Sequence, residues 1–120
     1  MHILLIEDNP NTAKLMELEL LDEGYQVTVA YDGLMGLKAA QSMQPNLVLL
    51  DWKLPTLSGP EICQALRQSG YQEPIIFVTA LSEVEYQAVA QQVGANDYIV
   101  KPFNLEVLLG RVQQQCPCVA

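Results

Sequence analysis

Short apolar runs alternate along the chain with longer segments in which apolar residues recur every three or four positions. The runs are residues 2–6, 25–30, 46–51, 74–80 and 97–100, and their length and β-branched content are typical of strands. The longer segments are typical of amphipathic helices, which we expect at about 10–23, 34–43, 59–68, 83–92 and 105–115. The pattern therefore predicts five β–α units in strict alternation.

Residues that commonly start or stop helices support these boundaries. Pro10 suits the first turn of the first helix, and Asn104 can cap the last one. Ser82 can cap the fourth helix, with Glu85 as its reciprocal partner three residues later. Glycines follow the first, third and fourth helices, as is common at helix ends. Gly36 lies inside the second helix and should weaken it.

The alternation of strands and helices predicts the fold class. It favours a parallel sheet with right-handed crossovers and helices on both faces. Residues 2–6, 46–51 and 74–80 are apolar throughout, as expected for central strands covered on both sides. We therefore expect a doubly wound α/β fold, with residues 1–120 forming a single domain.

Composition and charge limit the kinds of partner and the cellular compartment that we expect for this protein. The formal net charge is −8, and so acidic a surface repels phosphate backbones, which argues against direct nucleic-acid binding. No apolar stretch approaches the ~18 residues of a membrane span, and the first ten residues do not resemble a signal peptide. Three cysteines without a regular framework fit a reducing compartment. These features predict a cytoplasmic protein with no membrane contact.

The tail carries two of the cysteines, in the order Cys116-Pro117-Cys118. This spacing suggests either a metal or redox site or an ordinary tail. Two thiols without further ligands nearby make a poor zinc site, which favours the ordinary tail.

Polar residues stand where four of the predicted strands end: Glu7 and Asp8, Asp51, Thr79, and Lys101. Ligands of open α/β sheets bind beyond the carboxyl ends of the strands, so we expect these residues to lie together. Three neighbouring carboxylates favour a hard divalent cation such as Mg²⁺. A lysine and a hydroxyl beside the ion suggest phosphoryl oxygens as the substrate group. The candidate nucleophile is then Asp51, because aspartate carboxylates form acyl phosphates.

Each of these residues also has an ordinary explanation by itself. Glu7 and Asp8 could interact with a helix dipole, and Asp51 could be a turn residue. Thr79 could be a β-former and Lys101 a solvated lysine. Their joint placement at strand ends is what favours a functional site.

Four segments resemble the receiver domain of two-component response regulators. They are ILLIEDNP (3–10), PNLVLLDWKLPTLSG (45–59), PIIFVTA (74–80) and GANDYIVKPF (94–103). The resemblance covers essentially the whole chain. It implies a flavodoxin-like (βα)₅ fold whose five-stranded sheet has the order 2-1-3-4-5.

The resemblance also implies a function in a phosphorelay. Asp51 would accept a phosphoryl group from a histidine kinase or a histidine phosphotransfer protein. Mg²⁺, or alternatively Mn²⁺, would be held by Glu7, Asp8, Asp51 and the backbone carbonyl of Lys53. The domain would be a phosphoacceptor and not an enzyme. It would nevertheless carry out its own phosphorylation and dephosphorylation.

Further residues would then respond to the phosphoryl group. Thr79 and Lys101 would contact its oxygens, and the Lys101–Pro102 peptide would be cis. Tyr98 would turn inward as Thr79 moves, or else it is simply a strand aromatic that packs on the fourth helix. The face formed by the fourth helix, fifth strand and fifth helix would then change. A partner protein, or an output domain beyond residue 120 that could be transcriptional, would recognise this change.

The resemblance leaves two questions open. Asp97 and Arg111 match a pair that winged-helix regulators use across a symmetric dimer, which would make a homodimer through this face. Gln87, Val93 and Val107, however, stand where that subfamily has charges. The Lys53 side chain could alter attack by water at Asp51, or it could be a solvated loop lysine.

Three other classes of protein compete with this interpretation. A flavin-binding module would need a phosphate loop rich in glycine and hydroxyls after the first strand, where Glu7 and Asp8 stand. A phosphatase with an aspartate nucleophile usually carries a second aspartate at the position of Lys53. A receiver that only binds proteins would be expected to lack some of the motif residues. The single histidine, His2, offers no catalytic base, so the phosphoryl donor must be another protein.

Overall fold

A computed structural model describes residues 1–117 of the chain, and within them five strands alternate with five helices. The strands are β1 (His2–Ile6), β2 (Gln26–Ala30), β3 (Leu47–Leu50), β4 (Ile75–Thr79) and β5 (Asp97–Val100). The helices are α1 (Pro10–Asp22), α2 (Gly33–Met43), α3 (Gly59–Gln68), α4 (Val84–Gln92) and α5 (Leu105–Gln115). Each element lies where the hydrophobic pattern predicts it, within one or two residues.

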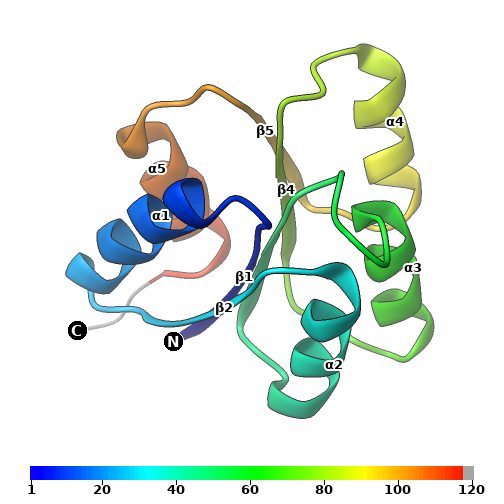
Figure 1. Ribbon diagram of the computed structural model, residues 1–120, viewed down its shortest axis with the longest axis horizontal. Coiled ribbons are helices and arrows are strands. Elements are labelled where there is room, and N and C mark those ends of the chain that lie inside the picture. The colour runs from blue at the N-terminus through cyan, green and yellow to red at the C-terminus, as the bar shows by residue number, and fades with distance from the viewer. Residues whose placement is uncertain (118–120) are drawn as a thin grey trace.

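The five strands form one parallel sheet in the order β2-β1-β3-β4-β5. Helices α1 and α5 cover one face of this sheet, and α2, α3 and α4 cover the other (Figure 1). The doubly wound α/β fold and its strand order are therefore confirmed. The order reverses between β1 and β3, and this reversal is where open α/β sheets bind ligands.

The central strands are buried on both faces because successive side chains point in opposite directions. In β1, Ile3 and Leu5 pack in the core under α1 and α5, while Leu4 and Ile6 pack in the core under α2 and α3. All four are at most 1% exposed. This two-sided burial holds the carboxyl ends of the strands in place.

The start of α4 differs from the prediction that Ser82 caps it. The helix begins one residue later, after Glu83, whose side chain makes no capping bond. The reason is that hydrogen bonds hold the preceding loop in another position. The backbone N–H of Leu81 donates to the Thr79 hydroxyl, and its carbonyl accepts from the Tyr98 hydroxyl. The Ser-x-x-Glu pattern forms a capping box instead at α3, between Ser58 and Glu61.

Gly36 does not interrupt α2, although glycine lowers helix propensity. A Cβ at this position would lie 2.6 Å from Cδ1 of Ile6. The absence of a side chain therefore lets α2 approach β1 closely, and this packing offsets the propensity cost.

Arg67, in the last turn of α3, connects segments at the amino edge of the sheet. Its Nε donates to the Gly94 carbonyl at 3.0 Å, and its Nη1 donates to the carbonyls of Tyr71 at 2.7 Å and Glu73 at 2.9 Å. Its Nη2 donates to Oδ1 of Asn96 at 2.9 Å. One guanidinium thus satisfies four acceptors that lie in two different connections, the one between α3 and β4 and the one between α4 and β5.

We expect Arg67→Ala to lower the free energy of unfolding by about 2 kcal/mol, because hydrogen bonds from a charged donor are lost and half-buried carbonyls lose their partners. Urea denaturation followed by circular dichroism measures this change. Arg67→Lys should recover only part of the loss, since an ammonium lacks the planar fork. Equal midpoints for the wild type and Arg67→Ala would contradict the expectation.

Among residues 1–117, no helix has the length and apolar content that crossing a membrane requires.

Candidate functional site

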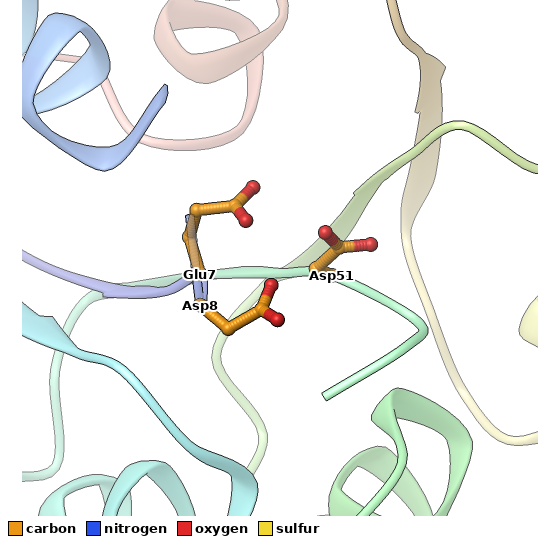
Figure 2. Close-up of side chains that lie close together, drawn as sticks. All are labelled: Glu7, Asp8 and Asp51. Atoms are coloured by element: carbon orange, nitrogen blue, oxygen red, sulfur yellow. The ribbon is translucent and has the colours of Figure 1, made fainter. Parts of the chain in front are cut away.

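Three carboxylates meet at the carboxyl edge of the sheet. Glu7 and Asp8 follow β1, Asp51 follows β3, and these two strands are neighbours with Ile6 opposite Leu50. One oxygen from each carboxylate lies within 4.8 Å of the others. Figure 2 shows the three side chains directed toward one shared space.

The three carboxylates differ in their exposure. Glu7 is 2% exposed and Asp51 is 9% exposed, whereas Asp8 is exposed to solvent. Two like charges so close together in a largely buried setting repel each other unless a cation offsets them.

Lys101 supplies a positive charge to this cluster. Its Nζ donates to Oδ2 of Asp51 at 2.9 Å and also to the carboxylate of Glu7. Its backbone N–H donates to the carbonyl of Thr79 at 2.8 Å, which fixes the start of the loop after β5. The peptide bond that follows, between Lys101 and Pro102, is cis.

Burial and ion pairing act in opposite directions on these groups. Burial raises the pKa of Glu7, and the hydrogen bonds from Lys101 and from the Asn9 N–H offset only part of this effect. Burial lowers the pKa of Lys101, but its hydrogen bonds to Glu7 and Asp51 outweigh burial, so the net shift is upward. The Lys101 ammonium therefore remains charged at neutral pH and offsets the carboxylates.

The backbone around Asp51 is held on both sides. Oδ1 of Asp51 accepts a hydrogen bond of 2.6 Å from the N–H of Trp52, whose carbonyl accepts from the N–H of Gly59 at 2.8 Å. A Cβ at Gly59 would lie 2.3 Å from the Asp51 carbonyl oxygen, so only glycine lets α3 begin here. Lys53, two residues after Asp51, is exposed.

Thr79 and Tyr98 are connected through the backbone of Leu81. Oγ1 of Thr79, which is 2% exposed, accepts from the Leu81 N–H at 3.3 Å. The Tyr98 hydroxyl donates to the Leu81 carbonyl at 2.6 Å, and its ring stacks on Phe77. Burial, together with the negative charges of nearby carboxylates, raises the pKa of Tyr98, so its hydroxyl stays protonated as a donor.

Asp97 and Arg111 form an ion pair within one chain. Nη1 of Arg111 in α5 lies 2.7 Å from Oδ1 of Asp97 at the start of β5. This pair lies outside the acidic cluster and belongs to the face formed by α4, β5 and α5.

Two features singled out in the sequence lie away from the site. His2 begins β1 at the opposite edge of the sheet, where its Nε2 lies 2.8 Å from Oγ1 of Thr28. Cys116 is buried at the end of α5, and Cys118 lies outside the described residues.

The hydrophobic pattern did not predict the ion pair between Glu7 and Lys101. These residues are 94 positions apart, and no local signal in the sequence connects them. The only indication was that both follow strand ends, which places them at one edge without saying which of the carboxylates the lysine contacts.

The parallel sheet and its acidic edge define the class of this protein. The family model of the response regulator receiver domain matches residues 3–113. The chain therefore belongs to the family of response regulator receiver domains, and the resemblance inferred from its motifs is confirmed.

Bacterial relatives support this assignment. The chain is 46% identical over 111 residues to the response regulator ArlR of Staphylococcus saprophyticus, covering 92% of this chain and 50% of that protein. It is 44% identical over 112 residues to YkoG, an uncharacterized transcriptional regulatory protein of Bacillus subtilis, covering 93% of this chain and 49% of that protein. The chain thus spans about half the length of the curated relatives it matches.

Among solved structures, the fold matches the receiver domain of the sensor histidine kinase PA1611 from Pseudomonas aeruginosa. The TM-score is 0.87 at 33% sequence identity, with 95% of each chain covered. That structure has a magnesium ion coordinated in its active-site cleft.

Proposed function

We propose that this domain accepts a phosphoryl group on Asp51 in a Mg²⁺-dependent phosphorelay reaction. The observation that carries the proposal is the meeting of Glu7, Asp8 and Asp51 at one strand edge, with Lys101 bonded to two of them. The donor would be the phosphohistidine of a histidine kinase or a histidine phosphotransfer protein. Its P–N bond breaks and leaves the electron pair on the imidazole, while a carboxylate oxygen of Asp51 forms the new P–O bond.

The donor set fits Mg²⁺. Mg²⁺ prefers oxygen ligands and commonly binds one or two carboxylates while it keeps several waters. Glu7, Asp8, Asp51 and the backbone carbonyl of Lys53 would hold it, and the exposure of Asp8 leaves room for water. Mn²⁺, which also suits carboxylate and carbonyl ligands, is an alternative ion. When bound, the ion would lower the repulsion between the anionic phosphoryl group and the anionic carboxylate.

The remaining residues would bind the phosphoryl group and transmit its arrival to the surface of the domain. Lys101 already touches Asp51 and would pair with a phosphoryl oxygen. Because Oγ1 of Thr79 accepts the Leu81 N–H, its own hydroxyl hydrogen can be donated to the phosphoryl group. A shift of Thr79 would release Leu81, and Leu81 also anchors the hydroxyl of Tyr98. In this way Tyr98 would pass the change to the face formed by α4, β5 and α5.

That face would carry the output of the domain. A partner protein or a further domain would read it in the cytoplasm. A transcriptional output would agree with the name of YkoG, an uncharacterized transcriptional regulatory protein. The face could also form a homodimer, for which Asp97 and Arg111 would exchange their internal ion pair for one across the interface. The domain would act as a phosphoacceptor with intrinsic self-phosphorylation and autodephosphorylation, rather than as an enzyme with a separate product.

The proposal is tested by intact-mass measurement after incubation with a small-molecule acyl phosphate. We expect one added phosphoryl group per chain in the presence of Mg²⁺ and none when EDTA removes the ion, because the clustered carboxylates then repel the anionic donor. A chain that gains the same mass with and without the ion would contradict the role of the metal. A chain that binds Mg²⁺ yet gains no mass from either an acyl phosphate or a phosphorylated histidine protein would contradict the phosphoacceptor function.

A further inference from the structure

The loop between Asp51 and α3 contains a strained turn. Thr56 has a φ of 72°, and the N–H of Leu57 donates to the carbonyl of Pro55 at 2.9 Å across it. A positive φ with an i to i+2 hydrogen bond belongs to the rare, strained form of γ-turn. A β-branched residue is unfavourable in this region of φ, so some interaction must hold Thr56 there.

The hydroxyl of Thr56 makes that interaction. Its Oγ1 accepts a hydrogen bond of 2.8 Å from the N–H of Leu34 and lies 3.4 Å from Oδ1 of Asp32. Beside it, the N–H of Gly33 donates to the Pro55 carbonyl at 2.9 Å. A Cβ at Gly33 would lie 2.1 Å from the Leu57 carbonyl oxygen, which shows how closely the loop packs on the first turn of α2.

This contact links the two sides of the acidic cluster. On one side, the loop carries Lys53, three residues before Thr56, and begins at Asp51. On the other side, α2 follows β2, whose last residue, Ala30, accepts a hydrogen bond of 3.0 Å from the N–H of Glu7. A change in the contact between loop and helix would therefore move the loop relative to Glu7 and Asp8.

We propose that Thr56 is a positioning residue for the metal site, and that its hydroxyl, bonded to the first turn of α2, fixes the loop that would present the Lys53 carbonyl to the ion. The inference rests on the Mg²⁺ site of the proposed function. Glycine at position 56 would adopt this φ without strain but could not make the bond to α2. The threonine therefore accepts backbone strain, and in return its hydroxyl fixes the position of the loop.

If Thr56 has this role, its substitution should change the affinity for Mg²⁺ without lowering the stability of the fold. We expect Thr56→Gly to melt at the same temperature as the wild type or higher, because the strain is relieved. Its affinity for Mg²⁺ should nevertheless fall about tenfold, as is typical when a residue that orients a metal ligand is lost. Thr56→Ser keeps the hydroxyl and should bind Mg²⁺ like the wild type. Thr56→Val keeps the shape without the hydroxyl and should bind more weakly.

Mg²⁺ titration followed by the fluorescence of Trp52, the only tryptophan, measures the affinity, since Trp52 follows Asp51 in the chain and its backbone N–H donates to the Asp51 carboxylate. Thermal unfolding by circular dichroism measures stability. Gln44→Gly is the matched control, because Gln44 also has a positive φ, of 48°, but lies at the far end of α2. It should gain stability and leave Mg²⁺ affinity unchanged.

The outcomes distinguish this inference from the function on which it rests. Wild-type Mg²⁺ affinity in folded Thr56→Gly or Thr56→Val would overturn the positioning role and leave the phosphoacceptor function standing. Absence of Mg²⁺ binding by the wild-type chain, seen before any substitution is made, would overturn both.

Discussion

Asp51→Asn should abolish phosphorylation completely. The substitution keeps the size of the side chain but replaces a nucleophilic carboxylate with an amide, which cannot form an acyl phosphate. The neighbouring carboxylates offer no substitute, because Glu7 is 2% exposed and bonded to Lys101, and Asp8 lies on a different strand end. Intact mass after incubation with an acyl phosphate and Mg²⁺ measures the loss.

The matched control for this experiment is Asp22→Asn. Asp22 is an exposed aspartate at the end of α1, so its substitution makes the same change of charge away from the site. This variant should gain mass like the wild type. An undiminished mass gain in Asp51→Asn would show that another residue is the phosphoacceptor.

Lys101→Met should cause the largest loss of stability at the site. In the absence of Mg²⁺ and at neutral pH, we expect the free energy of unfolding to fall by about 3 kcal/mol, because the buried Glu7 carboxylate loses its cation. Methionine retains the apolar stem of the side chain, so the loss reports charge more than packing. Saturating Mg²⁺ should restore part of the stability, since an ion that binds only the folded state stabilises it.

The loss in Lys101→Met should depend on pH in a defined direction. Burial already raises the pKa of Glu7, and removal of the lysine leaves that effect less opposed. A carboxyl group whose pKa is higher in the folded state destabilises the fold as pH rises through that folded value. The deficit should therefore be smallest near pH 4, about the ordinary pKa of glutamate, and should grow toward neutral pH.

Urea denaturation at several pH values measures both effects in EDTA-treated protein. Lys53→Met is the control, because Lys53 is exposed and only two residues from Asp51. Its stability should change by no more than about 0.5 kcal/mol, as is usual for surface substitutions. Wild-type stability of Lys101→Met at neutral pH without Mg²⁺ would show that the ion pair does not hold the cluster together.

The sequence by itself determined the fold and the edge of the sheet at which the site lies. Periodic burial leaves a direct record in the sequence, because side chains repeat their environment every two residues in a strand and every three to four in a helix. Because parallel strands share one carboxyl edge, the order of the elements also predicts that Glu7, Asp51 and Thr79 lie together.

Only the tertiary structure decided which polar group each of these residues contacts. It paired Lys101 with Glu7 as well as Asp51, placed Asp97 against Arg111 within one chain, and delayed the start of α4 because Leu81 bonds to Thr79 and Tyr98. It also showed that Thr56 adopts a positive φ.

The physical reason is that these contacts join residues far apart in the chain. Hydrophobic periodicity reports whether a side chain is buried, but the choice of a hydrogen-bonding partner depends on distances and directions of a few ångströms between separate elements. Those distances arise only once the helices have packed on the sheet and the loops have closed over its edge.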